Sequence, residues 1–321
     1  MSYLEIKGLY KRFDKEAVAL EDFSLQIDKG ERLGVVGESG SGKSTLLKVI
    51  AGLEIQDSGE VYLAGDKVLN PAKKLVPGYD EIQLVRQDYG LYPNSTVEEN
   101  IRRPLLQYNK GYAHERVEFL LETFGMKHLR NRYPRELSGG QQQKVAIARA
   151  LSLEPEVLLL DEPFSSLDPM QKRELMEELA LTFREIRVTV LLVTHDLQDA
   201  LWLTDKLCVM NKGRALRIGS PMEIYESPEN AYVAGLFSHL NPIPGTFSDF
   251  IRPTAVRLDK KDGKFSGRVA LRKFFPQYNL LAIKFNDMDL IWQVEDYTRN
   301  YALNEQVFLD WKKSHIIQLH N

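Results

Sequence analysis

Apolar and polar residues alternate through the first 30 residues of the chain, beginning at Leu4 and Ile6 and resuming at residues 20–27. A period of two predicts strands that bury one face and are joined by turns. Two further short apolar stretches, residues 61–63 and 68–69, predict another small β unit. We therefore expect an antiparallel β region near the start of the chain.

Near-continuous apolar runs predict buried central strands at residues 33–36, 157–160 and 188–193. Helical patterns cover residues 44–50 and 171–185. Strands that are apolar on both faces and alternate with helices are typical of a parallel sheet covered on both sides. The fold class is therefore α/β.

Two other regions differ in their pattern of apolar and polar residues. From about residue 88 to 153 the pattern is helical, with Thr96 as an expected helix cap, and predicts a helical subdomain. After Asn241 short apolar runs alternate with turn residues, so residues 241–321 predict a small all-β domain. The first domain is expected to cover residues 1–236.

Composition excludes several classes of protein. Of 321 residues, 43% are hydrophobic and 27% charged, which rules against disorder and fibrous arrays. A net charge of −3 gives no broad basic face for nucleic acid. The lone cysteine, Cys208, excludes an intrachain disulfide. No run reaches the roughly 20 apolar residues of a membrane-spanning helix, and the N-terminus lacks an apolar signal core. Composition thus predicts a soluble cytoplasmic protein.

A glycine-rich loop follows the first apolar strand and opens a helix: Gly37-Glu38-Ser39-Gly40-Ser41-Gly42-Lys43-Ser44. It fits the pattern G-x-x-x-x-G-K-[ST], whose backbone N–H groups and helix N-terminus cradle phosphates. Lys43 is expected to reach the β- and γ-phosphates, and the Ser44 hydroxyl to ligate Mg²⁺. A dinucleotide loop is excluded because Thr45 stands where its last glycine would be.

Two carboxylates, Asp161 and Glu162, end the apolar strand at residues 157–160. Ligands bind at the carboxyl ends of parallel strands, so we expect Asp161 to hold Mg²⁺ and Glu162 to polarise the attacking water. A purely structural strand ending is the alternative. His195 ends the next apolar strand and is expected to bond the γ-phosphate and orient the water.

The sequence Leu137-Ser138-Gly139-Gly140-Gln141 resembles the signature motif of ATP-binding cassette (ABC) ATPases. The phosphate loop, glutamine loop, signature, acid pair, D-loop and switch histidine also follow in the order of that family. The resemblance covers the chain from about Leu4 to Leu236. It implies an Mg²⁺-dependent ATPase with a P-loop NTPase (RecA-like) core, an antiparallel β subdomain and a helical subdomain.

The resemblance also implies roles for single residues. Gln87 lies in the glutamine loop, so the implied metal ligands are Ser44, Gln87 and Asp161, and the implied catalytic residues are Gln87, Glu162 and His195. Phe13 matches the aromatic that stacks on adenine, with a core role for Phe13, or stacking by Tyr10, as alternatives. The implied nucleotide contacts are Phe13, Gly37, Glu38, Ser39, Gly40, Ser41, Gly42, Lys43, Ser44, Thr45, Ser138, Gly139, Gly140, Gln141 and, in the D-loop, Asp168.

Partners follow from the same resemblance. A helix N-terminus near Gly140 would face the γ-phosphate held by a second copy, giving a head-to-tail homodimer. Transmembrane permease subunits, and indirectly an external solute-binding protein, are expected to work with it. The chain would then be a peripheral subunit at the cytoplasmic face of the inner membrane, with no nucleic-acid partner.

Residues 250–258 resemble the oligonucleotide-binding-like (OB-like) regulatory domain, often called TOBE, of maltose, sulfate, iron and polyamine importer ATPases. The added domain favours import over export. Whether it binds a regulatory ligand or only enlarges the dimer contact stays open. A soluble ABC ATPase acting on nucleic acid or ribosomes is the alternative, disfavoured because no long coiled coil or second cassette is present. The cargo stays open among iron, polyamines, inorganic anions and sugars.

Overall fold

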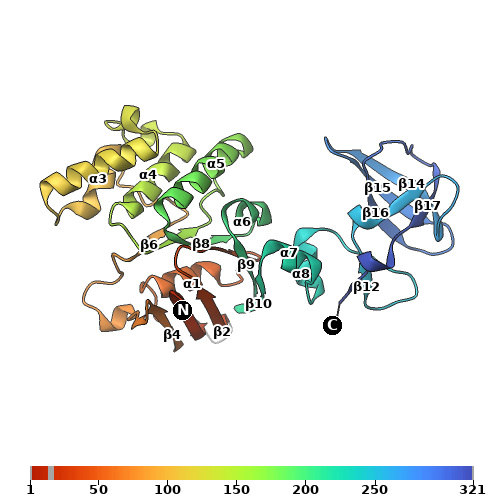
Figure 1. Cartoon of the computed structure of the whole chain (residues 1–321), viewed down its shortest axis with the longest axis horizontal. Coiled ribbons are helices and arrows are strands. Elements are labelled where there is room, and N and C mark those ends of the chain that lie inside the picture. Colours follow the sequence, from red (N-terminus) through yellow and green to blue (C-terminus); the bar gives the residue numbers. More distant parts are fainter. Residues whose placement is uncertain (1, 14–17, 320–321) are drawn as a thin grey trace. The chain divides into compact units, whose positions relative to one another are not determined.

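The computed structural model describes residues 2–13 and 18–319. The chain forms two compact units, Met1–Pro221 and Met222–Asn321, and Figure 1 shows the order of their elements. Within the described residues, no helix has the length and apolar character needed to cross a membrane.

An antiparallel sheet in the order β2-β1-β4-β5 occupies the start of the first unit. Its strands are β1 (Leu4–Arg12), β2 (Val18–Ile27), β4 (Ser58–Leu63) and β5 (Asp66–Lys67). Side chains of β1 alternate in burial as the period of two predicts, at Leu4 and Ile6 and again at Leu9 and Lys11, with a register shift between Ile6 and Leu9. The strand expected at residues 68–69 is displaced to β5, because Ala64 and Gly65 both have positive φ and turn the chain back in two residues.

A second sheet of six strands forms the centre of this unit, in the order β10-β9-β3-β8-β7-β6. All neighbouring pairs are parallel except β9 and β10. The bounds are β3 (Arg32–Val36), β6 (Ile82–Val85), β7 (Val157–Asp161), β8 (Thr189–Thr194), β9 (Lys206–Asn211) and β10 (Arg214–Gly219). The predicted α/β class, with its buried parallel strands, is confirmed.

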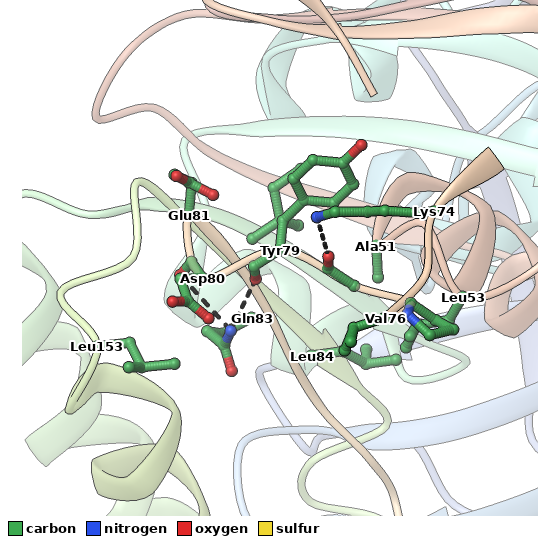
Figure 2. A pocket seen from close by; sticks show the side chains of 13 residues that line it. Ala51, Leu53, Lys74, Val76, Tyr79, Asp80, Glu81, Gln83, Leu84 and Leu153 are labelled. Atoms are coloured by element: carbon green, nitrogen blue, oxygen red, sulfur yellow. Dashed lines mark hydrogen bonds between the residues drawn. The ribbon is translucent and has the colours of Figure 1, made fainter. Parts of the chain in front are cut away.

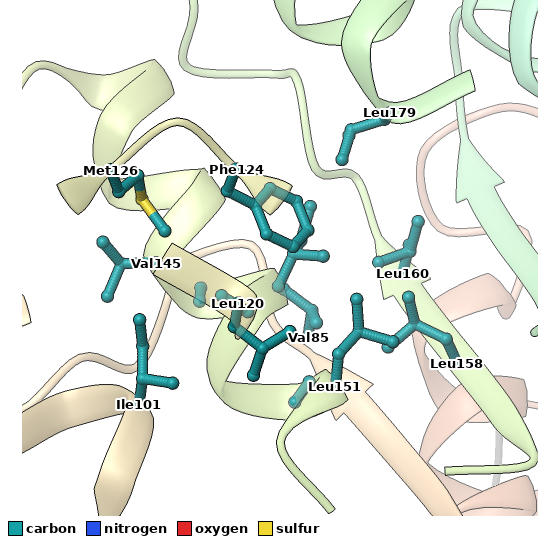
Figure 3. Packing of buried hydrophobic residues seen from close by; sticks show 14 of the residues in the cluster. Val85, Ile101, Leu120, Phe124, Met126, Val145, Leu151, Leu158, Leu160 and Leu179 are labelled. Atoms are coloured by element: carbon teal, nitrogen blue, oxygen red, sulfur yellow. The ribbon is translucent and has the colours of Figure 1, made fainter. Parts of the chain in front are cut away.

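Both faces of this central sheet are buried. Along β7, Leu158 and Leu160 belong to one hydrophobic cluster, and Val157 and Leu159 to another. Because successive side chains point to opposite faces, an all-apolar strand needs cover on both sides. Figure 3 shows the first cluster, in which Leu120, Phe124 and Val145 of the helical region accompany Leu158 and Leu160.

The α-helices of this unit's described residues, before α7, are α1 (Lys43–Ile50), α2 (Val97–Arg102), α3 (Lys110–Thr123), α4 (Gly139–Leu151), α5 (Pro169–Ile186) and α6 (Leu197–Leu203). Short 3₁₀ turns lie at Pro71–Lys73, Arg103–Leu105, Lys127–Leu129 and Pro134–Glu136. The expected cap at Thr96 is present as a capping box. Its hydroxyl accepts from Glu99 N at 3.2 Å, and the Glu99 carboxylate accepts from Thr96 N at 2.7 Å. Helices α2, α3 and α4 fall within the helical stretch predicted at residues 88–153.

The second unit begins one residue into α7 (Pro221–Glu226), contains α8 (Ala231–Phe237) and continues as antiparallel sheet. One sheet has the order β11-β12-β18 and the other β13-β17-β14-β15-β16. The strands are β11 (Asn241–Pro242), β12 (Asp249–Ile251), β13 (Arg257–Asp259), β14 (Phe265–Phe274), β15 (Asn279–Phe285), β16 (Ile291–Asp296), β17 (Gln306–Asp310) and β18 (Ile317–Gln318), with 3₁₀ turns at Pro253–Ala255 and Lys313–His315. This antiparallel arrangement agrees with the small OB-like domain expected from the sequence.

The second unit has its own core around the fully buried Trp292. Arg252 joins its helices to its sheet. Its guanidinium donates to Tyr225 O at 2.6 Å and to Ser238 Oγ at 3.0 Å. The two helices therefore group with the sheet, whereas the sequence placed the domain boundary after them, near residue 236.

Candidate functional site

The phosphate loop lies between β3 and α1, with backbone geometry that only glycine meets easily. Gly40 and Gly42 have φ of +81° and +102°. A Cβ at Gly42 would lie 2.0 Å from Ala19 O, and one at Gly37 would lie 2.1 Å from Met210 O. Both the left-handed φ values and the close backbone approaches therefore require glycine. Such glycines let the loop curl so that its N–H groups point inward.

Lys43 is the first residue of α1, and its side chain folds back over the loop. Its Nζ donates to Gly37 O at 2.8 Å, to Glu38 O at 2.7 Å and to Ser41 Oγ at 3.3 Å. Burial lowers the pKa of this ammonium, while the charges of Glu162, Asp161 and Glu38 act in the opposite direction. A buried cation thus lies inside the loop, where phosphate oxygens can replace its carbonyl partners.

Ser44 and Asp161 meet across the gap between α1 and β7. The Ser44 hydroxyl donates to Asp161 Oδ1 at 2.9 Å. Hydroxyl and carboxylate oxygens are the hard ligands that Mg²⁺ prefers, so the pair fits the predicted metal site. Burial raises the pKa of Asp161, the hydrogen bond from Ser44 opposes that rise, and the carboxylate of Glu162 adds to it.

Glu162 and His195 also lie together, with His195 Nδ1 3.1 Å from Glu162 Oε2. Glu162 adopts a left-handed φ of 45°, which costs a non-glycine residue about 1 kcal/mol or more. Its N–H donates to Val193 O at 2.9 Å. This bond ties Glu162 to the end of β8, the strand that leads into His195, and explains why the two side chains meet.

Gln87 follows β6, the edge strand beside β7. Its Nε2 donates to Ser165 Oγ at 3.1 Å, and Ser165 Oγ donates to Glu162 O at 3.0 Å. A second link between the same segments joins the hydroxyls of Tyr89 and Ser166. The structure therefore connects the predicted glutamine loop to the predicted D-loop. The Tyr89 contribution was not foreseen, because nothing local in the sequence marks that tyrosine.

The sites predicted at Ser138 and Asp168 begin helices. The Ser138 hydroxyl accepts from Gln141 N at 3.4 Å, and Gln141 Oε1 accepts from Ser138 N at 3.0 Å, so the signature residues close a capping box at α4. The Asp168 carboxylate caps α5 by accepting from Met170 N and Gln171 N at 3.0 and 3.1 Å. Both side chains have a local structural role in the single chain.

Phe13 has 53% of its surface exposed and lies under the Lys11 ammonium, 4.7 Å from the ring centroid. The alternative of a core aromatic therefore does not hold. Tyr10, its competitor for the adenine, is half-buried, with the Arg12 guanidinium 5.8 Å from its ring centroid. Phe13 directly follows β1, and its exposed aromatic ring is suited to stacking on a planar base.

Two cavities of the first unit differ in what lines them. One of about 330 Å³ is lined by residues of the acid pair, D-loop and switch histidine segments: Glu162, Phe164, Ser165, Leu167, Pro169, Lys172, Thr194, His195, Asp196 and Asp199. The other, of about 630 Å³ and shown in Figure 2, contains no predicted site residue. There Lys74 donates to Gly78 O at 2.6 Å and covers the Tyr79 ring, and Gln83 donates to Tyr79 O at 2.8 Å. These contacts order a loop, whereas the smaller cavity is lined by two of the predicted catalytic residues, Glu162 and His195.

Comparison with known proteins identifies this arrangement. The family model described as ABC transporter matches residues 20–165. The chain is 39% identical over 291 residues to the sulfate/thiosulfate import ATP-binding protein CysA of Bradyrhizobium diazoefficiens, covering 89% of this chain and 81% of that protein. The chain belongs to the ABC transporter family. The predicted ABC-type ATPase with its P-loop NTPase fold, which binds ATP, is thereby confirmed.

Other members of the family are also similar. The chain is 42% identical to the spermidine/putrescine import ATP-binding protein PotA of Thermotoga maritima, covering 74% of this chain and 64% of that protein. Among solved structures, CbiO1 from Clostridium perfringens, part of an ABC transporter complex, has a TM-score of 0.65 at 29% identity, covering 71% and 92% of the two chains. The ATP-binding cassette MJ0796, a dimer bound to ADP and Pi, has a TM-score of 0.59 at 31% identity, covering 68% and 98%.

Proposed function

We propose that this ABC ATPase is the ATP-hydrolysing subunit of a solute importer. The observation that carries the chemistry is the Glu162–His195 pair beside the Ser44–Asp161 pair. Asp161 ends β7 and Glu162 follows it, His195 follows β8, and Ser44 lies in α1 after the loop that follows β3; these three strands are neighbours in the sheet. Parallel strands end at one edge, so a nucleotide in the phosphate loop would present its γ-phosphate to these side chains.

Each residue then has a defined task. Lys43 and the loop N–H groups hold the phosphates, and Phe13 stacks on the adenine. Glu162 orients and polarises the water for in-line attack, and His195, bonded to Glu162, holds the γ-phosphate. Gln87, through its bond to Ser165, couples the glutamine loop to the D-loop beside the site.

Magnesium fits the same site. Ser44 and Asp161 would hold the ion, with Gln87 as a further oxygen ligand. When bound, Mg²⁺ neutralises charge on the β- and γ-phosphates. The raised pKa of Asp161 is consistent with this role. Burial disfavours the charged carboxylate when no cation is bound, and a bound cation would stabilise that charged form.

Hydrolysis is proposed to occur in a head-to-tail homodimer. Ser138, Gly139, Gly140 and Gln141 open α4, and its N-terminus offers N–H groups and a positive dipole end to a phosphate of the second copy. Asp168 would lie at the same interface in the D-loop. Two nucleotides would be enclosed between two copies, which gives the isologous arrangement of a two-fold dimer.

Import is supported by the relatives, several of which are named as import ATP-binding proteins for sulfate, sugars or polyamines. On this proposal, permease subunits hold the chain at the cytoplasmic face of the inner membrane, and an external solute-binding protein delivers the cargo. The OB-like unit at residues 241–321 is proposed as a regulatory domain. Stimulation of ATP hydrolysis by permease and binding protein reconstituted together in vesicles would test this assignment.

The catalytic part is tested with Glu162→Gln. The purified wild-type protein should hydrolyse MgATP, and the variant should lose on the order of 10²-fold or more in kcat, the usual contribution of a general base. MgATP binding should persist, so the variant should accumulate as a nucleotide-bound dimer in light scattering. Glu177→Gln, an exposed change on α5, is the matched control. Normal turnover by Glu162→Gln would contradict the role of Glu162 in polarising the attacking water.

A further inference from the structure

Lys172 lies in the first turns of α5 and pairs with two acids from another segment. Its Nζ is 2.6 Å from Asp196 Oδ2 and 2.5 Å from Asp199 Oδ1. A cation near a helix N-terminus opposes the helix dipole, so this position disfavours lysine unless partners compensate. Burial alone would lower the pKa of Lys172, but the interactions with Asp196 and Asp199 raise it above its usual value. The lysine is therefore a charged link and not a solvated surface residue.

Asp196 lies in the turn that carries His195, and Asp199 lies in the first turn of α6, the helix that follows it. Asp196 follows His195 directly and caps α6 by accepting from Gln198 N at 2.9 Å. Thr194 precedes His195, and the Thr194 hydroxyl accepts from Asp196 N at 3.0 Å and donates to Asp199 Oδ2 at 3.3 Å. Asp199 itself is only 3% exposed. The residues on both sides of His195 are thus held in one network, to which α5 contributes the cation Lys172.

The start of α5 is continuous with the D-loop. Asp168 caps the helix, and three residues earlier Ser165 contacts both Gln87 and the backbone of Glu162. Lys172 is one helical turn beyond Asp168. A shift of the D-loop that carries α5 with it would move the Lys172 ammonium and, through Asp196, the turn that holds His195.

We propose that Lys172 is a positioning residue for ATP hydrolysis. By pairing with Asp196 and Asp199, it links helix α5, which follows the D-loop, to the turn that carries His195, and so holds His195 beside Glu162. The inference rests on the proposed function. Lys172 acts through Asp196 and Asp199, and the reacting atoms are left to Glu162 and His195. The nucleotide-binding loop is a separate segment. Loss of Lys172 should therefore lower the rate of hydrolysis and leave the affinity for ATP unchanged.

The test compares Lys172→Met, Lys172→Arg and Arg173→Met in steady-state hydrolysis of MgATP. Arg173 is the matched control, because it is the next residue on α5, is largely exposed and pairs only with Glu177 on its own helix among its described partners. We expect Lys172→Met to lower kcat about 10- to 100-fold, as small misplacements of catalytic groups do, with KM unchanged within about twofold. Lys172→Arg should recover most of the rate, and Arg173→Met should match the wild type.

A fourth variant separates positioning from folding. Lys172→Met leaves the buried Asp199 charge unpaired, so Lys172→Met combined with Asp199→Asn removes the charge as well. The double variant should unfold near the wild-type temperature yet remain slow. Recovery of kcat in it, a rise in KM at constant kcat, or normal turnover by Lys172→Met would each overturn the positioning role. Absence of hydrolysis by the wild type would instead overturn the proposed function itself.

Discussion

At the scale of single residues, the site holds charges that the fold buries at a cost. Asp161 is the clearest case, since burial raises its pKa and only the Ser44 hydroxyl, together with the charges of Lys48 and Lys43, offsets that rise. Sequence predicted Asp161 and Glu162 as a pair at a strand end. It could not predict the left-handed φ of Glu162, because that strain is set by a bond to the neighbouring strand.

Asp161→Asn should therefore stabilise the nucleotide-free protein at pH 7. A folded pKa above the unfolded value near 3.8 means that the folded state binds the proton more tightly. The stability due to protonation is then fully present below pH 3.8 and lost as the pH rises through the folded pKa. The gain in Tm from Asp161→Asn should be present at pH 7 and shrink as the pH falls toward 3.8.

Thermal unfolding across this pH range checks the prediction, with the exposed Asp66→Asn as control. A gain that is independent of pH, or a loss of stability at pH 7, would contradict it. The same Asp161→Asn protein should hydrolyse ATP poorly, because a neutral amide is a weaker ligand for Mg²⁺ than a carboxylate. Stability and activity are thus expected to move in opposite directions at this residue.

At the scale of elements, helix starts carry the functional motifs. Ser138 opens α4, Asp168 opens α5 and Asp196 opens α6, each through a side chain that accepts from backbone N–H groups. Helix starts are local features, so the sequence predicted a helix N-terminus near Gly140 and a helix at residues 171–185, although it gave no prediction of α6. The ion pairs between α5 and the α6 turn join residues far apart in the chain, and no local pattern predicts them.

Asp168→Ala should destabilise the first unit by about 1 kcal/mol, the usual cost of removing an N-cap side chain. Asp168→Asn keeps an oxygen that can accept from Met170 N and Gln171 N, so it should cost much less. Urea unfolding of the two variants measures the difference. Equal losses would mean that the negative charge of Asp168, and not its cap, stabilises the helix.

At the scale of the whole molecule, the chain consists of two units with separate cores, and Arg252 bonds the helices α7 and α8 to the sheet of the second. The fragment 222–321 keeps Tyr225 O and Ser238 Oγ as acceptors for the buried guanidinium, whereas the fragment 241–321 removes them. A buried charged group without its partners costs roughly 1–3 kcal/mol or more. We therefore expect the longer fragment to unfold cooperatively at the higher temperature.

Circular dichroism of the two fragments, with Arg252→Leu in the longer one, measures the role of this residue. The variant should lower the Tm of fragment 222–321 and bring it toward that of fragment 241–321. If fragment 241–321 is as stable as fragment 222–321, the helices α7 and α8 add nothing to the second unit. The boundary near residue 236 that the sequence predicts would then be the correct one.

By itself, the sequence determined the elements and motifs that depend on neighbours along the chain. These include the alternating strands, the apolar central strands, the glycine loop before Lys43 and the cap at Thr96, because periodicity, backbone freedom and caps are local physics. The tertiary structure decided which side chains meet: Ser44 with Asp161, Glu162 with His195 and Lys172 with Asp196. Strand order and helix packing set these contacts, and they arise only when distant segments come together.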